Sequence, residues 1–208
     1  ENYGSAMAPF YSTLAIWVGA VVMAAMLKVT VADSTKKILF HPKEYQLYIG
    51  RILLLIIIGF MQSALICLGD LFFLGIQCKH PVMFVLTGMF TSFVYVNLIY
   101  ALTVSFGDIG KAIAVVLMVM QVAGSGGTFP IQCAPKFFQV VYPLLPFTHS
   151  MNAMRECIAG FYGTTYAAEI GKLAIYLVPS LLLGLLLRKP IIKMNDAFME
   201  KLESTHLI

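Results

Sequence analysis

Long apolar runs without charge alternate with short polar segments along the chain. Four runs, at residues 2–27, 52–69, 81–107 and 112–135, reach or nearly reach the length of a membrane span. A helix rises about 1.5 Å per residue, so about 20 residues cross a hydrocarbon core of about 30 Å. A fifth run, 173–187, is shorter and needs residues 169–172 as its interfacial end. The pattern predicts five transmembrane helices, at approximately 6–27, 50–69, 81–105, 111–129 and 169–188.

A membrane barrel, the alternative to helices, needs strands in which apolar and polar residues alternate. Residues 53–58 and 115–120 are unbroken apolar runs, which favour helices. Composition agrees, because 60% of the 208 residues are hydrophobic, 12% are charged and the mean hydropathy is +0.86. A water-soluble core of this size cannot bury so much apolar surface. We therefore predict an all-α integral membrane protein.

Basic residues are concentrated on one side of this topology. Segments 28–51, 106–111 and 188–208 hold ten of the 14 Lys and Arg residues, and the four others are Lys79, Lys136, Arg155 and Lys172. The positive-inside rule then places the 29–50 loop and the 189–208 tail in the cytoplasm and the N-terminus outside. We expect the chain to be the C-terminal part of a longer protein, and a cleaved signal sequence is the alternative. The net charge of +4 suggests anionic headgroups, and not nucleic acid, as neighbours.

The longest polar segment, the cytoplasmic loop 29–50, contains two helix-start signals. Asp33, Ser34 and Thr35 form the first, and Pro42 the second, so two short interfacial helices are expected. The preferred interpretation is a connector that faces lipid headgroups, because the loop mixes basic and aromatic residues. The alternative is a coupling-type loop that docks a cytoplasmic partner such as an ATPase. Its candidate contact residues are Lys36, Lys37, Lys43 and Glu44.

Few polar residues lie within the spans. Gln62, Asn97 and Gln121 fall near helix centres, where a carboxamide is costly unless it bonds a neighbouring helix. We expect them to face the bundle interior, as ordinary interhelical bonds more readily than as a transport site. Asp70 is expected at the outer interface, solvated or paired.

Residue sets that bind metals or catalyse reactions are absent from the pattern. The four histidines fall in separate segments, and Gly124-Ser125-Gly126-Gly127 is followed by no Lys-Ser or Lys-Thr. We predict no cofactor, no metal site and no enzymatic activity. Cys67 falls within a span, whereas Cys78, Cys133 and Cys157 belong near the outer face, where a disulfide and free thiols both remain open.

Residues 130–160 are neither a plain span nor a plain loop. Glycines 124, 126 and 127 and Pro130 break the preceding helix, and a new helix starts at Ala134-Pro135-Lys136. Pro143 and Pro146 end it, and Thr148 is expected to cap a third piece. That piece has an apolar face of Phe147, Met151, Met154 and Ile158, with Arg155 and Glu156 on its polar side. We predict a re-entrant or interfacial helical hairpin on the extracellular side, and a surface connector is the alternative.

The same segment resembles a known family. It contains Phe-Pro, Pro-Lys-Phe-Phe-Gln, Tyr-Pro-Leu-Leu-Pro-Phe-Thr and Asn-Ala-Met-Arg-Glu, and Asn2, Tyr3 and Gly4 resemble the entry into the same domain. The chain is similar to the C-terminal membrane domain of the YhgE/Pip family, named after a phage infection protein, and more distantly to type-2 ABC exporters. The matching residues are Phe129, Pro130, Pro135, Phe137, Phe138, Tyr142, Pro143, Pro146, Phe147, Thr148, Asn152, Arg155 and Glu156.

This resemblance implies a six-helix domain in a bacterial cell membrane, whose first helix and a large extracellular insertion precede Glu1. In the exporters the hairpin lies at the outer end of the substrate path, a homodimer forms the conduit, and an ATPase of another chain docks on the loop that corresponds to 29–50. Two functions follow as hypotheses. One is a permease that exports a hydrophobic or cell-envelope substrate. The other is a membrane anchor for an extracellular receptor or secretion-accessory domain, for example in phage adsorption, without transport.

Overall fold

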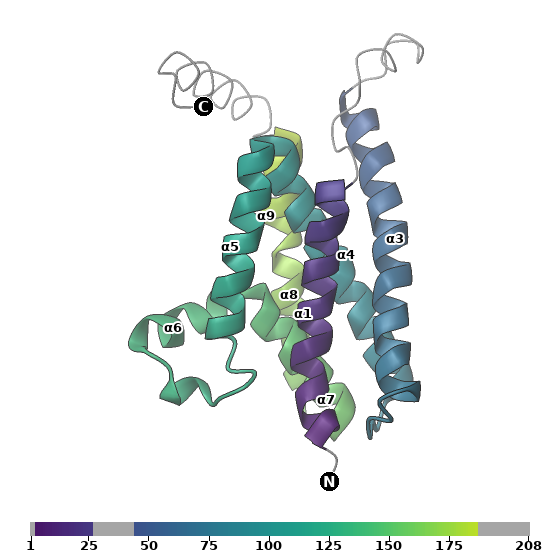
Figure 1. Ribbon diagram of the computed structural model, residues 1–208, viewed down its shortest axis with the longest axis vertical. Coiled ribbons are helices and arrows are strands. Elements are labelled where there is room, and N and C mark those ends of the chain that lie inside the picture. The colour runs from purple at the N-terminus through teal and green to yellow at the C-terminus, as the bar shows by residue number, and fades with distance from the viewer. Residues whose placement is uncertain (1–2, 27–43, 187–208) are drawn as a thin grey trace.

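The computed structural model describes residues 3–26 and 44–186, and all regular structure within these ranges is helical (Figure 1). The long helices are α1 (Tyr3–Met26), α3 (Glu44–Phe72), α4 (Pro81–Phe106), α5 (Asp108–Gly124), α7 (Pro146–Ala159) and α8 (Thr165–Ile175). Short elements complete the bundle: η1 (Ile131–Cys133), α6 (Lys136–Val141), η2 (Tyr142–Leu144), α9 (Leu177–Leu181) and η3 (Leu182–Leu186). The prediction of an all-helical fold is confirmed for the described residues.

Four helices in the described ranges are long and apolar enough to cross a membrane. They are Tyr3–Met26, Tyr48–Phe72, Pro81–Phe106 and Thr165–Gly184. The last of these starts before the predicted 169 and consists of α8, α9 and the beginning of η3. A fifth span at 111–129 stays a prediction, because α5 has only 17 residues and ends at Gly124.

Helix α4 forms the centre of the bundle and contacts α1, α3, α5, α7, α8 and α9. Pro81 starts it, since a fixed φ suits the first helical position, and Gly107 ends it at φ +61°. The chain reverses directly into α5, and a Cβ built on Gly110 would overlap the carbonyl of Leu102. This close approach explains a glycine in the first turn of α5.

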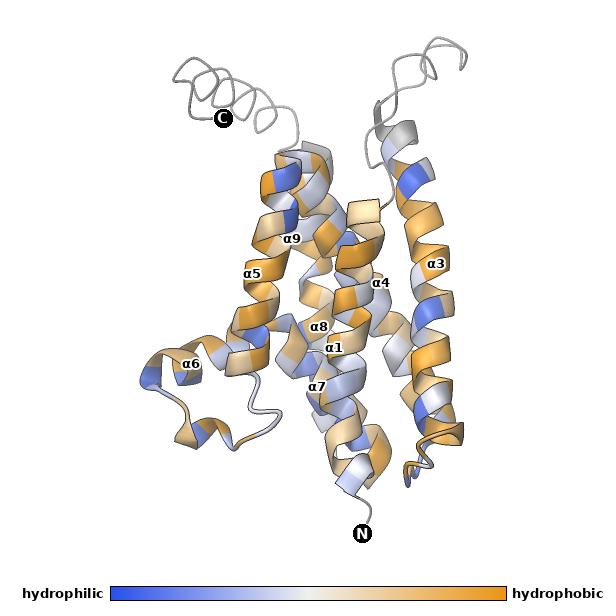
Figure 2. Ribbon diagram, viewed as in Figure 1, coloured by the Kyte–Doolittle hydropathy of each residue, from blue (hydrophilic) through white to orange (hydrophobic). Residues whose placement is uncertain are grey.

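Hydrophobic residues run along the long helices (Figure 2), and many of their side chains are exposed on the outside of the bundle. On α3 the exposed residues include Leu53, Leu54, Ile57, Met61 and Leu65. A soluble monomer rarely exposes such a continuous apolar surface, whereas a lipid-facing helix requires it. The inner faces carry the large buried residues, among them Trp17 and Tyr95, whose rings meet edge to face at 4.7 Å.

The segments predicted to lie outside do share one end of the bundle. The N–H of Gln77 donates to Ser5 Oγ at 2.8 Å, and the N–H of His80 donates to the carbonyl of Cys157 at 3.1 Å. These bonds bring the start of α1, the 73–80 turn and the end of α7 together. The candidate docking residues Lys36, Lys37 and Lys43 and the 189–208 tail lie outside the described residues, and Glu44 begins α3.

Candidate functional site

The candidate site is the chain between α5 and the last span, residues 125–164, together with the helices that it contacts. Its two halves differ. The first half, residues 125–144, contains α6 and extends sideways from the bundle; we call it the α6 half (Figure 1). The second half contains α7, which packs against α1, α4 and α8. Residues 145–151 are all buried. A connector lying on the surface, the alternative interpretation of this segment, therefore does not describe α7.

The apolar face of α7 anchors it in the bundle. Phe147 is 1% exposed and its ring meets that of Phe10 on α1 edge to face, with centroids 5.6 Å apart. Met154 is fully buried, and its sulfur accepts a hydrogen bond from Thr13 of α1 at 3.5 Å. Met151 belongs to the same cluster as Phe10 and Phe147. The packing of α7 on α1 thus depends on residues at three-to-four spacing.

The predicted cap of α7 is wrong. The helix begins at Pro146, after Leu145, so Thr148 lies inside the first turn and not before it. Its hydroxyl is buried and has no partner among the described residues. The free N–H of Phe147 is taken by Gln121 Oε1 of α5 at 3.1 Å. Proline determined the start, because its ring fits the first helical position and needs no N–H partner.

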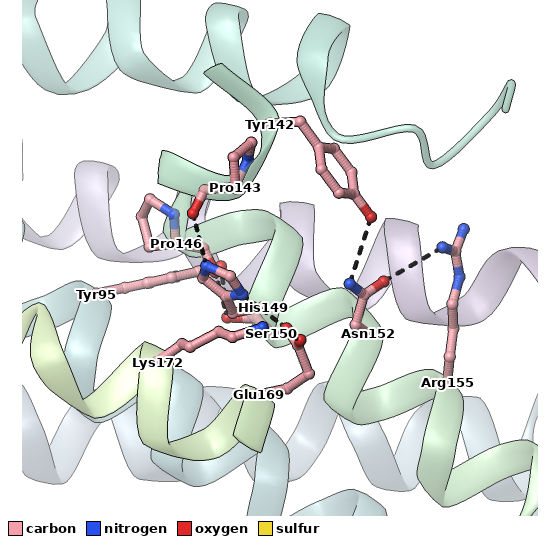
Figure 3. Close-up of polar contacts among 10 residues, drawn as sticks. All are labelled: Tyr95, Tyr142, Pro143, Pro146, His149, Ser150, Asn152, Arg155, Glu169 and Lys172. Atoms are coloured by element: carbon pink, nitrogen blue, oxygen red, sulfur yellow. Dashed lines mark hydrogen bonds and ion pairs between the residues drawn. The ribbon is translucent and has the colours of Figure 1, made fainter. Parts of the chain in front are cut away.

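A polar cluster joins α7 to the last span (Figure 3). His149 Nδ1 lies 2.6 Å from Glu169 Oε2, and its Nε2 lies 3.0 Å from the carbonyl oxygen of Pro143. Lys172 donates to the other oxygen of Glu169 at 2.8 Å. His149 and Glu169 are 4% and 7% exposed, so the two side chains meet in the protein interior. Beside them Tyr95 of α4 donates to Ser150 at 2.9 Å.

The polar side of α7 faces the glycine-rich residues 124–127 at the end of α5. Asn152 donates to the Tyr142 hydroxyl at 3.4 Å, and Arg155 donates to Asn152 Oδ1 at 3.5 Å (Figure 3). Arg155 also donates to the carbonyl of Gly126 at 3.4 Å. Burial lowers the pKa of Arg155, but guanidinium remains charged at any physiological pH. Glu156 accepts from the N–H of Tyr162 at 2.8 Å, so it holds the turn after α7.

A pocket of about 380 Å³ lies between the end of α5 and the α6 half. Four of the predicted site residues line it: Phe129, Pro130, Pro135 and Phe138. The remaining lining residues are mostly small or apolar, and they include Val122, Ile131 and Cys133. Phe137 is 58% exposed on α6 and is not among the lining residues. Six other residues of the predicted set lie on α7, and the remaining three, Phe137, Tyr142 and Pro143, lie on α6 and η2.

The polar residues of the spans form hydrogen bonds, either to a neighbouring helix or within their own helix. Gln62 donates to the carbonyl of Ala15 on α1 at 3.2 Å, and Gln121 connects α5 to α7. Asn97 is buried but donates to Phe93 of its own helix at 2.7 Å. Asp70 accepts a hydrogen bond from Ser12 and is 9% exposed, so it is paired and not solvated.

Sequence reasoning missed the cluster around His149, which was considered only as a metal ligand and rejected. A signal was present, because Glu169 and Lys172 stand three residues apart in an otherwise apolar run. All four cysteines are free, with Cys67 and Cys157 buried and Cys133 exposed. Within the described ranges no group of three His, Cys, Asp or Glu side chains could hold a metal ion.

Comparisons with known proteins agree with this architecture. The family model described as "ABC-2 family transporter protein" matches residues 1–187. The uncharacterized protein YhgE of Bacillus subtilis (strain 168) is 28% identical over 159 residues, which is 76% of this chain and 20% of that protein. The chain thus spans about a fifth of the length of this curated relative. No solved structure matches it. Because the family model covers nearly all of the chain, the protein belongs to the ABC-2 family of transporter proteins and carries a YhgE-like membrane domain.

Proposed function

We propose that this chain is the membrane-embedded part of an export permease that moves a hydrophobic or cell-envelope molecule. The observation that carries the proposal is the match to the ABC-2 transporter family over residues 1–187. The family is one of transporters and not a class of enzymes, in agreement with a membrane bundle that serves as a passage.

The geometry at the end of α5 supports this role. The pocket of about 380 Å³ falls within the size range of small-molecule sites, about 300–1,000 Å³, and its lining suits an apolar guest. Arg155 ties Gly126, which lines this pocket, to α7, so a movement of α7 relative to the bundle would change the pocket. We assign the outer gate to residues 129–138 and to α7.

Two copies of the domain would form the conduit, and an ATPase supplied by another chain would drive it. We propose that the ATPase docks on the cytoplasmic loop 29–50 through Lys36, Lys37, Lys43 and Glu44. The N-terminus of this chain would face the outside of a bacterial cell and its C-terminus the cytoplasm, in keeping with the ten-to-four distribution of basic residues.

The test compares cells that lack the full-length protein with cells that carry the wild type or a variant. Ala134→Trp fills the pocket, and Val140→Thr, at a position 70% exposed on α6, is the control. Mass spectrometry of lipids and other apolar molecules in the envelope and medium should show a loss that the wild type and Val140→Thr restore. Ala134→Trp should not restore it. Restoration by all three proteins, or the consistent absence of an ATPase from purified native complexes, would contradict the permease.

One observation favours a second function, a membrane anchor for an extracellular receptor or secretion-accessory domain. Four fifths of the YhgE relative lies outside the matched region, which leaves room for such a domain. Under this hypothesis, replacing Gln62, Asn97 or Gln121 leaves activity intact, whereas deleting the domain outside the membrane abolishes it. An export defect caused by the three replacements would count against the anchor.

A further inference from the structure

The contacts of His149 require more protons than a neutral imidazole carries. Its Nε2 faces the carbonyl oxygen of Pro143 at 3.0 Å, and its Nδ1 faces Glu169 Oε2 at 2.6 Å. A carbonyl and an ionised carboxylate only accept hydrogen bonds, whereas a neutral imidazole has one N–H and one lone pair. Both contacts are satisfied together only when a further proton lies between His149 and Glu169.

We propose that His149 and Glu169 form a proton-binding site that locks α7 to the last membrane span. The bound proton resides on Nδ1 of His149, because Lys172 donates to the second oxygen of Glu169 at 2.8 Å and so favours the ionised carboxylate. The site does not depend on transport, and it would exist equally in a membrane anchor.

Loss of this proton has a direct structural cost. One ring nitrogen then carries no N–H. Either Nδ1 faces the Glu169 oxygen at 2.6 Å or, in the other tautomer, Nε2 faces the Pro143 carbonyl oxygen at 3.0 Å, and in both cases two acceptors repel each other. His149 and Glu169 are 4% and 7% exposed, so water cannot replace the lost bond without entering the contact between α7 and α8. We therefore expect α7 to loosen its contact with the last span or with η2 when the proton leaves.

Other groups near the site do not supply the missing proton. Helix α1 contacts α7 through Phe10 and Thr13, neither of which titrates. The titratable and charged groups that the remaining elements place beside His149 or its immediate neighbours are Tyr95 of α4, Tyr142 of η2, and Lys172 and Tyr176 of the last span, whereas Tyr166 of the last span bonds Thr87. Tyr95 and Tyr142 bond Ser150 and Asn152, and the Tyr176 ring lies 6.3 Å from that of His149. His149 and Glu169 are therefore left as the pair that holds the proton.

The charge state of His149 can be observed directly. We would label histidine with ¹⁵N in the full-length protein, reconstitute it in lipid nanodiscs and record spectra from about pH 5 to about pH 9. His149→Asn identifies the signal of His149 among those of the other histidines. Two protonated ring nitrogens at low pH, with one lost as pH rises, are the expected result. A neutral ring throughout this range would overturn the proposal, whether or not any variant folds.

Hydrogen exchange tests the structural consequence. As the proton leaves, protection of the α7 amides should fall by about tenfold. Glu169→Gln should remove this pH dependence, because a Gln amide can donate to Nδ1 while Nε2–H still bonds Pro143. Tyr95→Phe is the matched control, since it removes the bond to Ser150 and should lower protection equally at every pH. Identical pH profiles in the wild type and Glu169→Gln would overturn the lock.

Discussion

Gln121 Oε1 of α5 accepts a hydrogen bond from the backbone N–H of Phe147 at 3.1 Å, and so replaces the missing cap at the start of α7. Both residues are 1% exposed. The first N–H groups of a helix have no partner within the helix, and a buried one costs free energy unless another group accepts from it. A side chain in α5 therefore stabilises the first turn of a helix that lies 26 residues further along the chain.

Replacing Gln121 by Met should destabilise the protein by about 1–3 kcal/mol, because the Phe147 N–H loses its acceptor while the side-chain volume stays similar. The free energy of chemical unfolding in detergent micelles measures the effect. Gln132→Met is the control, since Gln132 is exposed. Equal stability of both variants would show that this bond contributes nothing.

Gly127 should tolerate no side chain. A Cβ at this position would overlap the ring of Phe10, which is buried against Phe147. Gly127→Ala is expected to cost about 1–3 kcal/mol through the forced shift of that ring. Gly171→Ala provides a matched comparison, because nothing lies within 4 Å of the added Cβ and alanine favours the helix. The two variants should change the unfolding free energy in opposite directions.

The thiols should differ sharply in reactivity. Burial raises the pKa of Cys157 to about 11, so at neutral pH almost none of it is the reactive thiolate. Cys133 is exposed. Brief treatment of the folded protein with a maleimide should label Cys133 and leave Cys157 unmodified, as mass spectrometry of peptides would show. Rapid labelling of Cys157 below pH 8 would contradict its burial.

The two ends of α5 should be accessible from opposite sides if this helix crosses the membrane. In intact cells an impermeant maleimide should label Cys133. It should not label Lys111→Cys in a protein whose Cys78 and Cys133 are replaced by Ser. Permeabilising the cells should make Lys111→Cys reactive. Labelling of both positions from outside would show that α5 does not span, and would leave four crossings.

At α5 and at the last span, the length of the charge-free run differs from the length of the helix. Residues 112–135 form a long uncharged run, yet α5 ends at Gly124, because glycine and proline end a helix without introducing charge. The last uncharged run is shorter, yet its helix extends from Thr165, because Glu169 is paired with both Lys172 and His149. Charge alone was therefore a poor guide to helix length at both positions.

The sequence by itself determined the class of the protein, the approximate spans, the break after α5 and the apolar face of α7. These features depend on residues close together in the chain, through hydropathy, helical spacing and the local effects of glycine and proline. Only the tertiary structure decided that α7 is buried and which polar atoms meet, as Gln121 with Phe147 and His149 with Glu169. Such pairs join residues on different helices, and a buried polar group takes whichever partner the packing brings within hydrogen-bond distance.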